Sequence, residues 1–176
     1  MRKSCIPNIF TFVNLSCGIF SLLSTFNSNF IWASAFIMIA GLVDRYDGRI
    51  ARFLDVSSDL GKELDSLADL VSFGVAPAIL TFVLFNFKNL GPYGFLGLIL
   101  LIAFPICGAF RLARYNVASF DGVFTGVPIT IVGCFMALFA LICTSTNCMD
   151  KLFFVAIIFM IVGSYLMVST LKLKKF

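Results

Sequence analysis

The 176-residue chain contains no histidine, and only 12% of its residues are charged whereas 60% are hydrophobic. A soluble domain is usually about half apolar. The shortage of charge therefore excludes an ordinary soluble protein and predicts an integral membrane protein. The absence of histidine excludes imidazole ligands, so any metal bound by this chain is expected to be a divalent cation held by oxygen atoms.

Paired cysteine motifs are missing as well. Six cysteines are present, but none forms a C-x-x-C pair and most lie inside apolar runs. We therefore expect small buried side chains rather than thiol ligands or redox groups. The basic N-terminus is not followed by a cleavage site of small residues, so the first hydrophobic segment is expected to be retained.

Long hydrophobic runs predict about six membrane spans of roughly 20 residues each, in a single domain over residues 1–176. The spans are expected near Phe10–Phe26, Phe30–Arg52, Ser58–Phe85, Pro92–Tyr115, Phe124–Cys143 and Lys151–Leu171. Short turns are expected at Asn86–Gly91 and Thr144–Asp150. The predicted fold class is therefore an all-α integral membrane bundle.

Four aspartates stand close together in this apolar sequence: Asp44, Asp47, Asp65 and Asp69. A carboxylate near the bilayer core costs about 3 kcal/mol, so some compensating partner is expected. Within each pair the residues are three or four apart and project from one helix face, and the short Phe53–Ser57 connection makes the two helices antiparallel neighbours. Two divalent cations about 3.5–4 Å apart would offset the repulsion and would suit phosphoryl transfer.

The basic residues indicate on which side of the membrane these aspartates lie. Of the 13 lysines and arginines, all except Lys88 and Lys151 fall on one side of the predicted bundle. The positive-inside rule identifies that side as cytoplasmic. Both termini and the aspartates are then cytoplasmic, which predicts a multi-pass protein of the cell membrane with its active site at the cytoplasmic side.

Small residues and one arginine accompany the aspartates: Gly48, Ala51, Arg52 and Gly61. Small residues allow a ligand or a neighbouring helix to approach the backbone closely. One interpretation is plain helix packing. Beside four carboxylates and an arginine, a slot for a nucleotide is the favoured alternative.

The complete pattern is D-x2-D-G-x2-A-R-x8-G-x3-D-x3-D, and it resembles the signature of the CDP-alcohol phosphatidyltransferases. The resemblance implies a six-helix membrane fold and a homodimer. It further implies that Asp44, Asp47 and Asp65 bind two divalent cations, Mg²⁺ or Mn²⁺. Asp69 is implied as the general base and as a contact to the second metal. The CDP-binding residues implied in this way are Gly48, Ala51, Arg52 and Gly61.

Further segments resemble the branch of that family whose acceptor alcohol is L-serine: Ile6–Asn8 with Thr11 and Asn14, Gly61–Pro77, Phe110–Asn116 and Phe124–Ile129. This resemblance implies transfer of a phosphatidyl group from CDP-diacylglycerol to L-serine at membrane lipid, with no nucleic acid as a partner. Asn8, Thr11 and Asn14 are then expected to approach the nucleotide, although asparagine and threonine also cap and pack helices.

The residues expected to bind serine are Arg111, Arg114 and Asn116, because a guanidinium fork matches a carboxylate. The same arginines would also serve as membrane anchors or as contacts to lipid phosphates. An acceptor such as glycerol 3-phosphate or inositol phosphate would use them equally. A cation transporter is a different class of protein with acids inside the membrane. It would place them near mid-membrane, often in duplicated halves, whereas these acids gather at one side of a chain without repeats.

Overall fold

A computed structural model of the chain describes residues 5–53, 59–117, 124–146, 148–149, 151–170 and 172–173. It forms seven α-helices, a π-helical segment η1, two 3₁₀ turns and one pair of very short strands. In chain order they are α1 (Cys5–Phe26), α2 (Phe30–Phe53), α3 (Asp59–Asp69), η1 (Leu70–Val75), α4 (Ala76–Leu84), η2 (Phe87–Asn89), η3 (Pro92–Gly94), α5 (Phe95–Val117), β1 (Phe124–Thr125), α6 (Ile129–Thr146), α7 (Phe153–Val168) and β2 (Lys172–Leu173).

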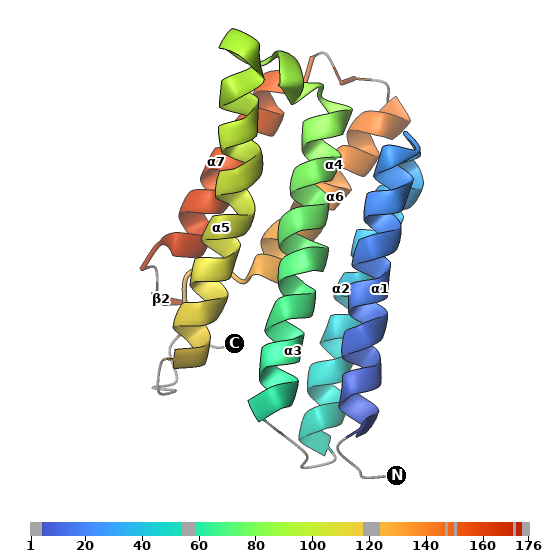
Figure 1. The fold of residues 1–176 in the computed structure, drawn as a ribbon, viewed down its shortest axis with the longest axis vertical. Coiled ribbons are helices and arrows are strands. Elements are labelled where there is room, and N and C mark those ends of the chain that lie inside the picture. Colours follow the sequence, from blue (N-terminus) through green and yellow to red (C-terminus); the bar gives the residue numbers. More distant parts are fainter. Residues whose placement is uncertain are drawn as a thin grey trace.

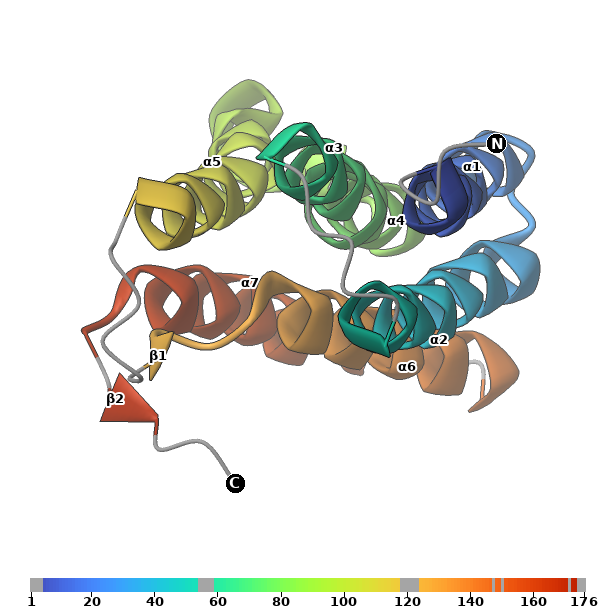
Figure 2. The same cartoon turned by 90° about the horizontal axis from the view of Figure 1, so that it is seen from below.

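The helices lie roughly along one long axis and form two rows (Figures 1 and 2). One row holds α5, the continuous α3–η1–α4 rod and α1, and the other holds α7, α6 and α2. The largest packing contact joins α1 to α2, and α2 also packs against α6. The end of α2 and the beginning of α3 lie at the same end of the bundle, and the two helices run in opposite directions.

The expected all-α membrane fold is confirmed. Within the described residues, four helices are long and apolar enough to cross a membrane: Asn8–Phe26, Leu60–Leu84, Pro92–Val117 and Ile129–Thr146. The helices α2 and α7 occupy the other two predicted spans, and α7 is a shorter apolar helix. Large apolar side chains point outward, for example Phe135, which is 65% exposed, and Phe154, which is 73% exposed. Such exposure suits contact with lipid rather than water.

The predicted beginning of the fifth span is wrong. Phe124–Thr125 forms a strand that pairs antiparallel with Lys172–Leu173, and the helix begins only at Ile129. Gly126 between them has a φ of +80°, a conformation that glycine adopts without steric cost. The last span ends at Val168 rather than Leu171, because Ser169 leaves the helical region with φ −57° and ψ 153°.

The central rod changes from α-helical to π-helical geometry for one wide turn, the segment η1. The segment η1 begins directly after Asp69, and Ser72, Phe73 and Gly74 within it are buried. π-helical turns of this kind occur frequently at functional sites. The turn at the other end of the rod is longer than predicted, because the 3₁₀ segments extend it from Phe87 to Gly94.

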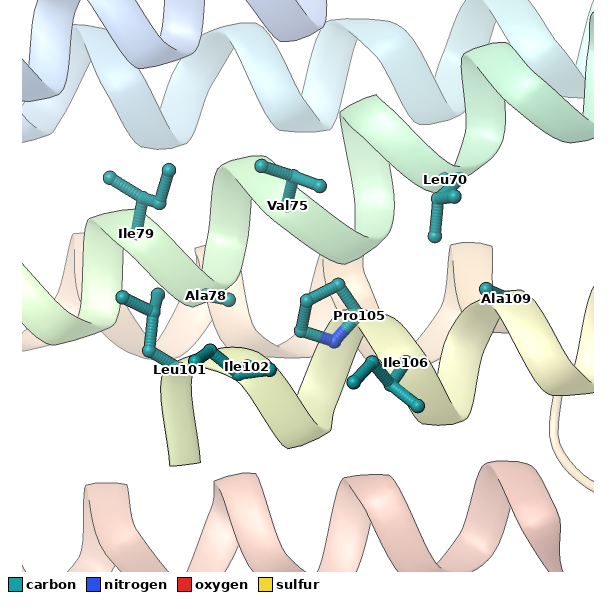
Figure 3. A pocket seen from close by; sticks show the side chains of 9 residues that line it. All are labelled: Leu70, Val75, Ala78, Ile79, Leu101, Ile102, Pro105, Ile106 and Ala109. Atoms are coloured by element: carbon teal, nitrogen blue, oxygen red, sulfur yellow. The ribbon is translucent and has the colours of Figure 1, made fainter. Parts of the chain in front are cut away.

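A groove of about 380 Å³ separates the central rod from α5 on the outside of the bundle (Figure 3). Its lining consists of hydrocarbon side chains alone: Leu70, Val75, Ala78, Ile79, Leu101, Ile102, Pro105, Ile106 and Ala109. A surface without any polar side chain cannot orient a charged or phosphorylated substrate. The polar residues that could bind such a substrate lie instead at the end of the bundle where α3 begins.

Candidate active site

Three of the four predicted acidic ligands come together in the structure. Asp44 from α2 and Asp65 and Asp69 from α3 each offer a carboxylate oxygen, and these three atoms all lie within 4.8 Å of one another. Opposite oxygens around one Mg²⁺ are about 4.2 Å apart, and around one Ca²⁺ about 5 Å. The carboxylates therefore fit a divalent cation held between the two helices. The side chain of Asp47 lies outside the described part of the chain.

The three carboxylates differ in their exposure. Asp44 and Asp65 are partly exposed, whereas Asp69 is only 7% exposed. Asp69 interacts electrostatically with both other aspartates and with Arg111 of α5. Like charges held this closely repel one another unless a cation or proton intervenes. The cluster is therefore open at the side of Asp44 and Asp65, and Asp69 forms its inner wall.

Helix α1 contributes a residue that directly contacts Asp69. The side-chain amide of Asn14 donates a hydrogen bond from Nδ2 to Asp69 Oδ1 over 3.0 Å. Asn14 is only 1% exposed. The sequence placed Asn14 near the nucleotide but did not indicate this contact. The available signal is that Thr11, Asn14 and Gly18 lie on one face of a mainly apolar helix at spacings of three and four.

A second contact fixes α1 against the π-helical turn. Ser72 Oγ donates a hydrogen bond to the backbone oxygen of Asn14 over 2.9 Å. The two segments can approach this closely because residue 18 is glycine: a Cβ atom there would lie 2.5 Å from Ser72 Oγ. Both Asn14 contacts therefore lie at the junction of α3 and η1, directly beside the acidic cluster.

Among the described residues, Arg111 of α5 is a basic side chain that interacts with the cluster. It is 8% exposed and interacts with Asp69. Its Cζ atom lies 5.7 Å from the ring centroid of Tyr115. Within the described ranges its Nε atom has no hydrogen-bond partner. A buried guanidinium with donor capacity left is suited to bind an anion.

Arg114 and Asn116 make contacts that join helices. Arg114 donates from Nη1 to Val168 O over 3.1 Å and from Nη2 to Ser169 O over 3.3 Å, at the C-terminal end of α7. Asn116 Nδ2 donates to Glu63 Oε1 over 3.2 Å and to Ser66 Oγ over 3.0 Å. The predicted contact of these two residues with serine stays a prediction.

We expect Arg114→Ala to lower the free energy of unfolding by about 1.5–3 kcal/mol, the range for hydrogen bonds made by charged groups. The carbonyl groups at the end of α7 would lose their donor. Denaturant titration in detergent measures this, with Lys151→Ala as the control on an exposed residue. An unchanged free energy of unfolding would show that the Arg114 contact does not stabilise the bundle.

The structure describes only some of the residues that were predicted to bind CDP. Asn8 is half-buried and Thr11 is buried, and both lie on α1 before Asn14. Gly61 lies in α3, one turn before Asp65. Their role in binding CDP stays a prediction. The surroundings of three further predicted residues on α2 lie outside what the structure describes: Gly48, Ala51 and Arg52.

Comparison with known proteins relates this chain to a family of enzymes. The family model for CDP-alcohol phosphatidyltransferases matches residues 4–169, which span every helix from α1 to α7. The chain is 37% identical over 129 residues to the CDP-diacylglycerol–serine O-phosphatidyltransferase of Bacillus subtilis, covering 73% of this chain and 71% of that protein. It is 32% identical over 177 residues to a protein of the same name from Helicobacter pylori, covering 97% and 72%. The protein of that name from Saccharomyces cerevisiae is 38% identical over 124 residues, covering 66% and 43%.

Proposed function

The chain belongs to the CDP-alcohol phosphatidyltransferase family, and we propose that it transfers the phosphatidyl group of CDP-diacylglycerol to the hydroxyl group of L-serine, which yields phosphatidylserine and CMP. The observation that carries the chemistry is the cluster of Asp44, Asp65 and Asp69 at the junction of two helices. The names of the relatives from three organisms support serine as the acceptor.

In the proposed reaction the serine oxygen attacks the phosphorus atom that bears diacylglycerol. The bond from this phosphorus to the bridging oxygen breaks, and CMP leaves with that oxygen. Asp69 accepts the proton of the serine hydroxyl. Asp44, Asp47 and Asp65 would hold two divalent cations, Mg²⁺ or Mn²⁺, which would supply positive charge to offset that of the pyrophosphate group. Positioning and electrostatics supply most of the catalysis in phosphoryl transfer.

Arg111 is the residue we assign to the serine carboxylate. Its guanidinium is buried, and its Nε lacks a hydrogen-bond partner among the described residues. It also interacts with Asp69, the proposed base. A carboxylate bound there would place the adjacent hydroxyl group of serine near the proton acceptor. The predicted homodimer remains an expectation that rests on the family resemblance.

An acceptor panel tests the proposed function. Purified protein is supplied with CDP-diacylglycerol, Mg²⁺ or Mn²⁺, and one acceptor: L-serine, glycerol 3-phosphate or inositol phosphate. We expect CMP release with serine and little with the phosphorylated alcohols. Release with glycerol 3-phosphate alone would assign another acceptor within the same family. Release with none of them, together with cation flux in vesicles, would favour the transporter.

The proposed orientation places both termini and the aspartates in the cytoplasm, because lysines and arginines gather at that side. We expect a fluorescent protein fused to either terminus to fluoresce, and alkaline phosphatase fused after Leu90 to be active outside the cell. Phosphatase fused to the C-terminus is the matched control and should be inactive. Active phosphatase at the C-terminus would contradict the orientation, and with it a cytoplasmic active site.

A further inference from the structure

Asn14 carries a polar atom beside the acidic cluster that takes no part in its contact with Asp69. Asn14 Oδ1 is buried, and within the described residues no hydrogen-bond donor contacts it. The orientation of this amide is determined by its neighbour. Exchanging its oxygen and nitrogen would place two acceptors, the amide oxygen and Asp69 Oδ1, against each other. Asn14 Nδ2 therefore faces Asp69, and Oδ1 remains available to a donor.

The position of this oxygen is well defined. The backbone of Asn14 is held by Ser72 Oγ at 2.9 Å, and its side chain is held by Asp69 at 3.0 Å. Buried acceptors are nearly always satisfied in folded proteins. Asn14 Oδ1 is held in place and has no donor among the described residues, and its amide group is hydrogen-bonded to the proposed base. This oxygen is therefore suited to accept a hydrogen bond from an N–H group of a substrate.

We propose that Asn14 has two functions in the transfer reaction: its Nδ2 atom positions Asp69, and its Oδ1 atom accepts a hydrogen bond from the ammonium group of the acceptor alcohol. This inference rests on the proposed function. In serine the hydroxyl and ammonium groups are on adjacent carbon atoms. When the hydroxyl faces Asp69, the ammonium therefore comes within reach of the atoms that contact Asp69.

The charges around Asp69 agree with this assignment. An ammonium bound to Asn14 Oδ1 lies close to the Asp69 carboxylate, which contacts the same amide group and attracts the positive charge. Arg111 on α5 then faces the serine carboxylate, so the zwitterion is bound by groups of opposite charge. The acceptor reaches Asn14 from the side where Asp44 and Asp65 are partly exposed. Glycerol 3-phosphate and inositol phosphate have no ammonium and would leave Oδ1 unpaired.

The cytosine amino group of CDP-diacylglycerol is another N–H donor. If it occupied Oδ1, removal of Asn14 would raise the KM for CDP-diacylglycerol. If the ammonium group of serine occupies Oδ1, removal of Asn14 would lower kcat/KM for serine instead. The two sources are therefore separated by measuring the two substrates independently.

The test compares L-serine with 3-hydroxypropionate, which has the hydroxyl and the carboxylate but no ammonium. In the wild type we expect kcat/KM to favour serine by at least about 10², since a site built to hydrogen-bond a polar group strongly rejects an analogue that lacks it. For Asn14→Ala we expect kcat to fall with both acceptors, because Asp69 is no longer held. The ratio of kcat/KM for serine to kcat/KM for 3-hydroxypropionate should be at least about tenfold lower than in the wild type. The KM for CDP-diacylglycerol should stay within about threefold of the wild-type value.

Ser21→Ala is the matched control. Ser21 lies two turns further along α1, is fully buried, and its Oγ likewise lacks a partner in the described part of the chain. We expect this variant to keep the preference for serine. Thermal stabilisation by CDP with Mn²⁺ shows whether each variant still binds nucleotide. If Asn14→Ala does not fold, Asn14→Ser is used for the same comparison.

An unchanged preference for serine in Asn14→Ala or Asn14→Ser would overturn the assignment of Oδ1 to the ammonium. A raised KM for CDP-diacylglycerol with unchanged preference would assign Oδ1 to cytosine instead. An unchanged kcat would overturn the positioning of Asp69. If the wild type releases no CMP with serine, the proposed function fails first, and the inference fails with it.

Discussion

Replacing Asp65 by alanine is expected to abolish CMP release and to weaken metal binding, and the same holds for Asp44 and Asp47. Asp44 and Asp65 place oxygens within 4.8 Å of each other and of Asp69. Removing one ligand leaves the remaining carboxylates with an incomplete coordination shell and leaves the pyrophosphate charge uncompensated. CMP release across a Mn²⁺ titration measures the activity, and calorimetry of Mn²⁺ binding measures the affinity.

Glu63→Gln is the control for these variants. Glu63 is an exposed acid on the same helix, and its Oε1 atom accepts a hydrogen bond from Asn116, which glutamine can still accept. We expect it to retain metal binding and most activity. If any one of the alanine variants kept near-normal turnover over the whole metal titration, that aspartate would not be an essential ligand.

Replacing Asp69 by asparagine is expected to lower kcat by at least about 10², the low end for general base catalysis. Asparagine has the same size, and its side-chain oxygen can still accept the hydrogen bond from Asn14 Nδ2. The helix junction therefore stays intact while the proton acceptor is lost. We expect CDP-diacylglycerol to bind with metal as before. The measurements are kcat with serine and nucleotide affinity, both at saturating metal.

The opposite result for Asp69→Asn would assign this residue another role. Lost nucleotide binding with a normal residual kcat would make Asp69 chiefly a metal ligand, and the base would have to be another group. Asp69→Ala separates the contribution of the Asn14 contact, because alanine removes the acceptor of that hydrogen bond as well. A larger loss of kcat in the alanine variant than in the asparagine variant is expected.

Most of the fold is predictable from hydropathy, because a helix in a membrane must satisfy its own backbone hydrogen bonds. Apolar runs of the right length therefore indicate α1, the α3–η1–α4 rod, α5 and α6 directly. The errors concern segment ends. Hydropathy does not distinguish the strand residues Phe124–Thr125 from the first turn of a helix, because their partner Lys172–Leu173 lies far along the chain.

The acidic cluster was predictable for a local reason. Asp65 and Asp69 are four residues apart, so helical periodicity alone places them on one face. Asp44 joins them because α2 and α3 run in opposite directions and are only five residues apart in the sequence. Helical periodicity could not distinguish the role of Arg111 from that of Arg114. They are three residues apart on one helix, yet Arg111 is buried near Asp69 and Arg114 contacts the end of α7.

The sequence alone determined that this is a helical membrane protein with a family signature of carboxylates, because composition and spacing are local properties of the chain. Only the tertiary structure decided which other groups contact those carboxylates. Asn14 lies 55 residues before Asp69, and no periodicity relates residues on different helices. Their contact depends on how α1 packs against the π-helical turn, where Gly18 allows Ser72 to approach. That packing is a property of the assembled bundle.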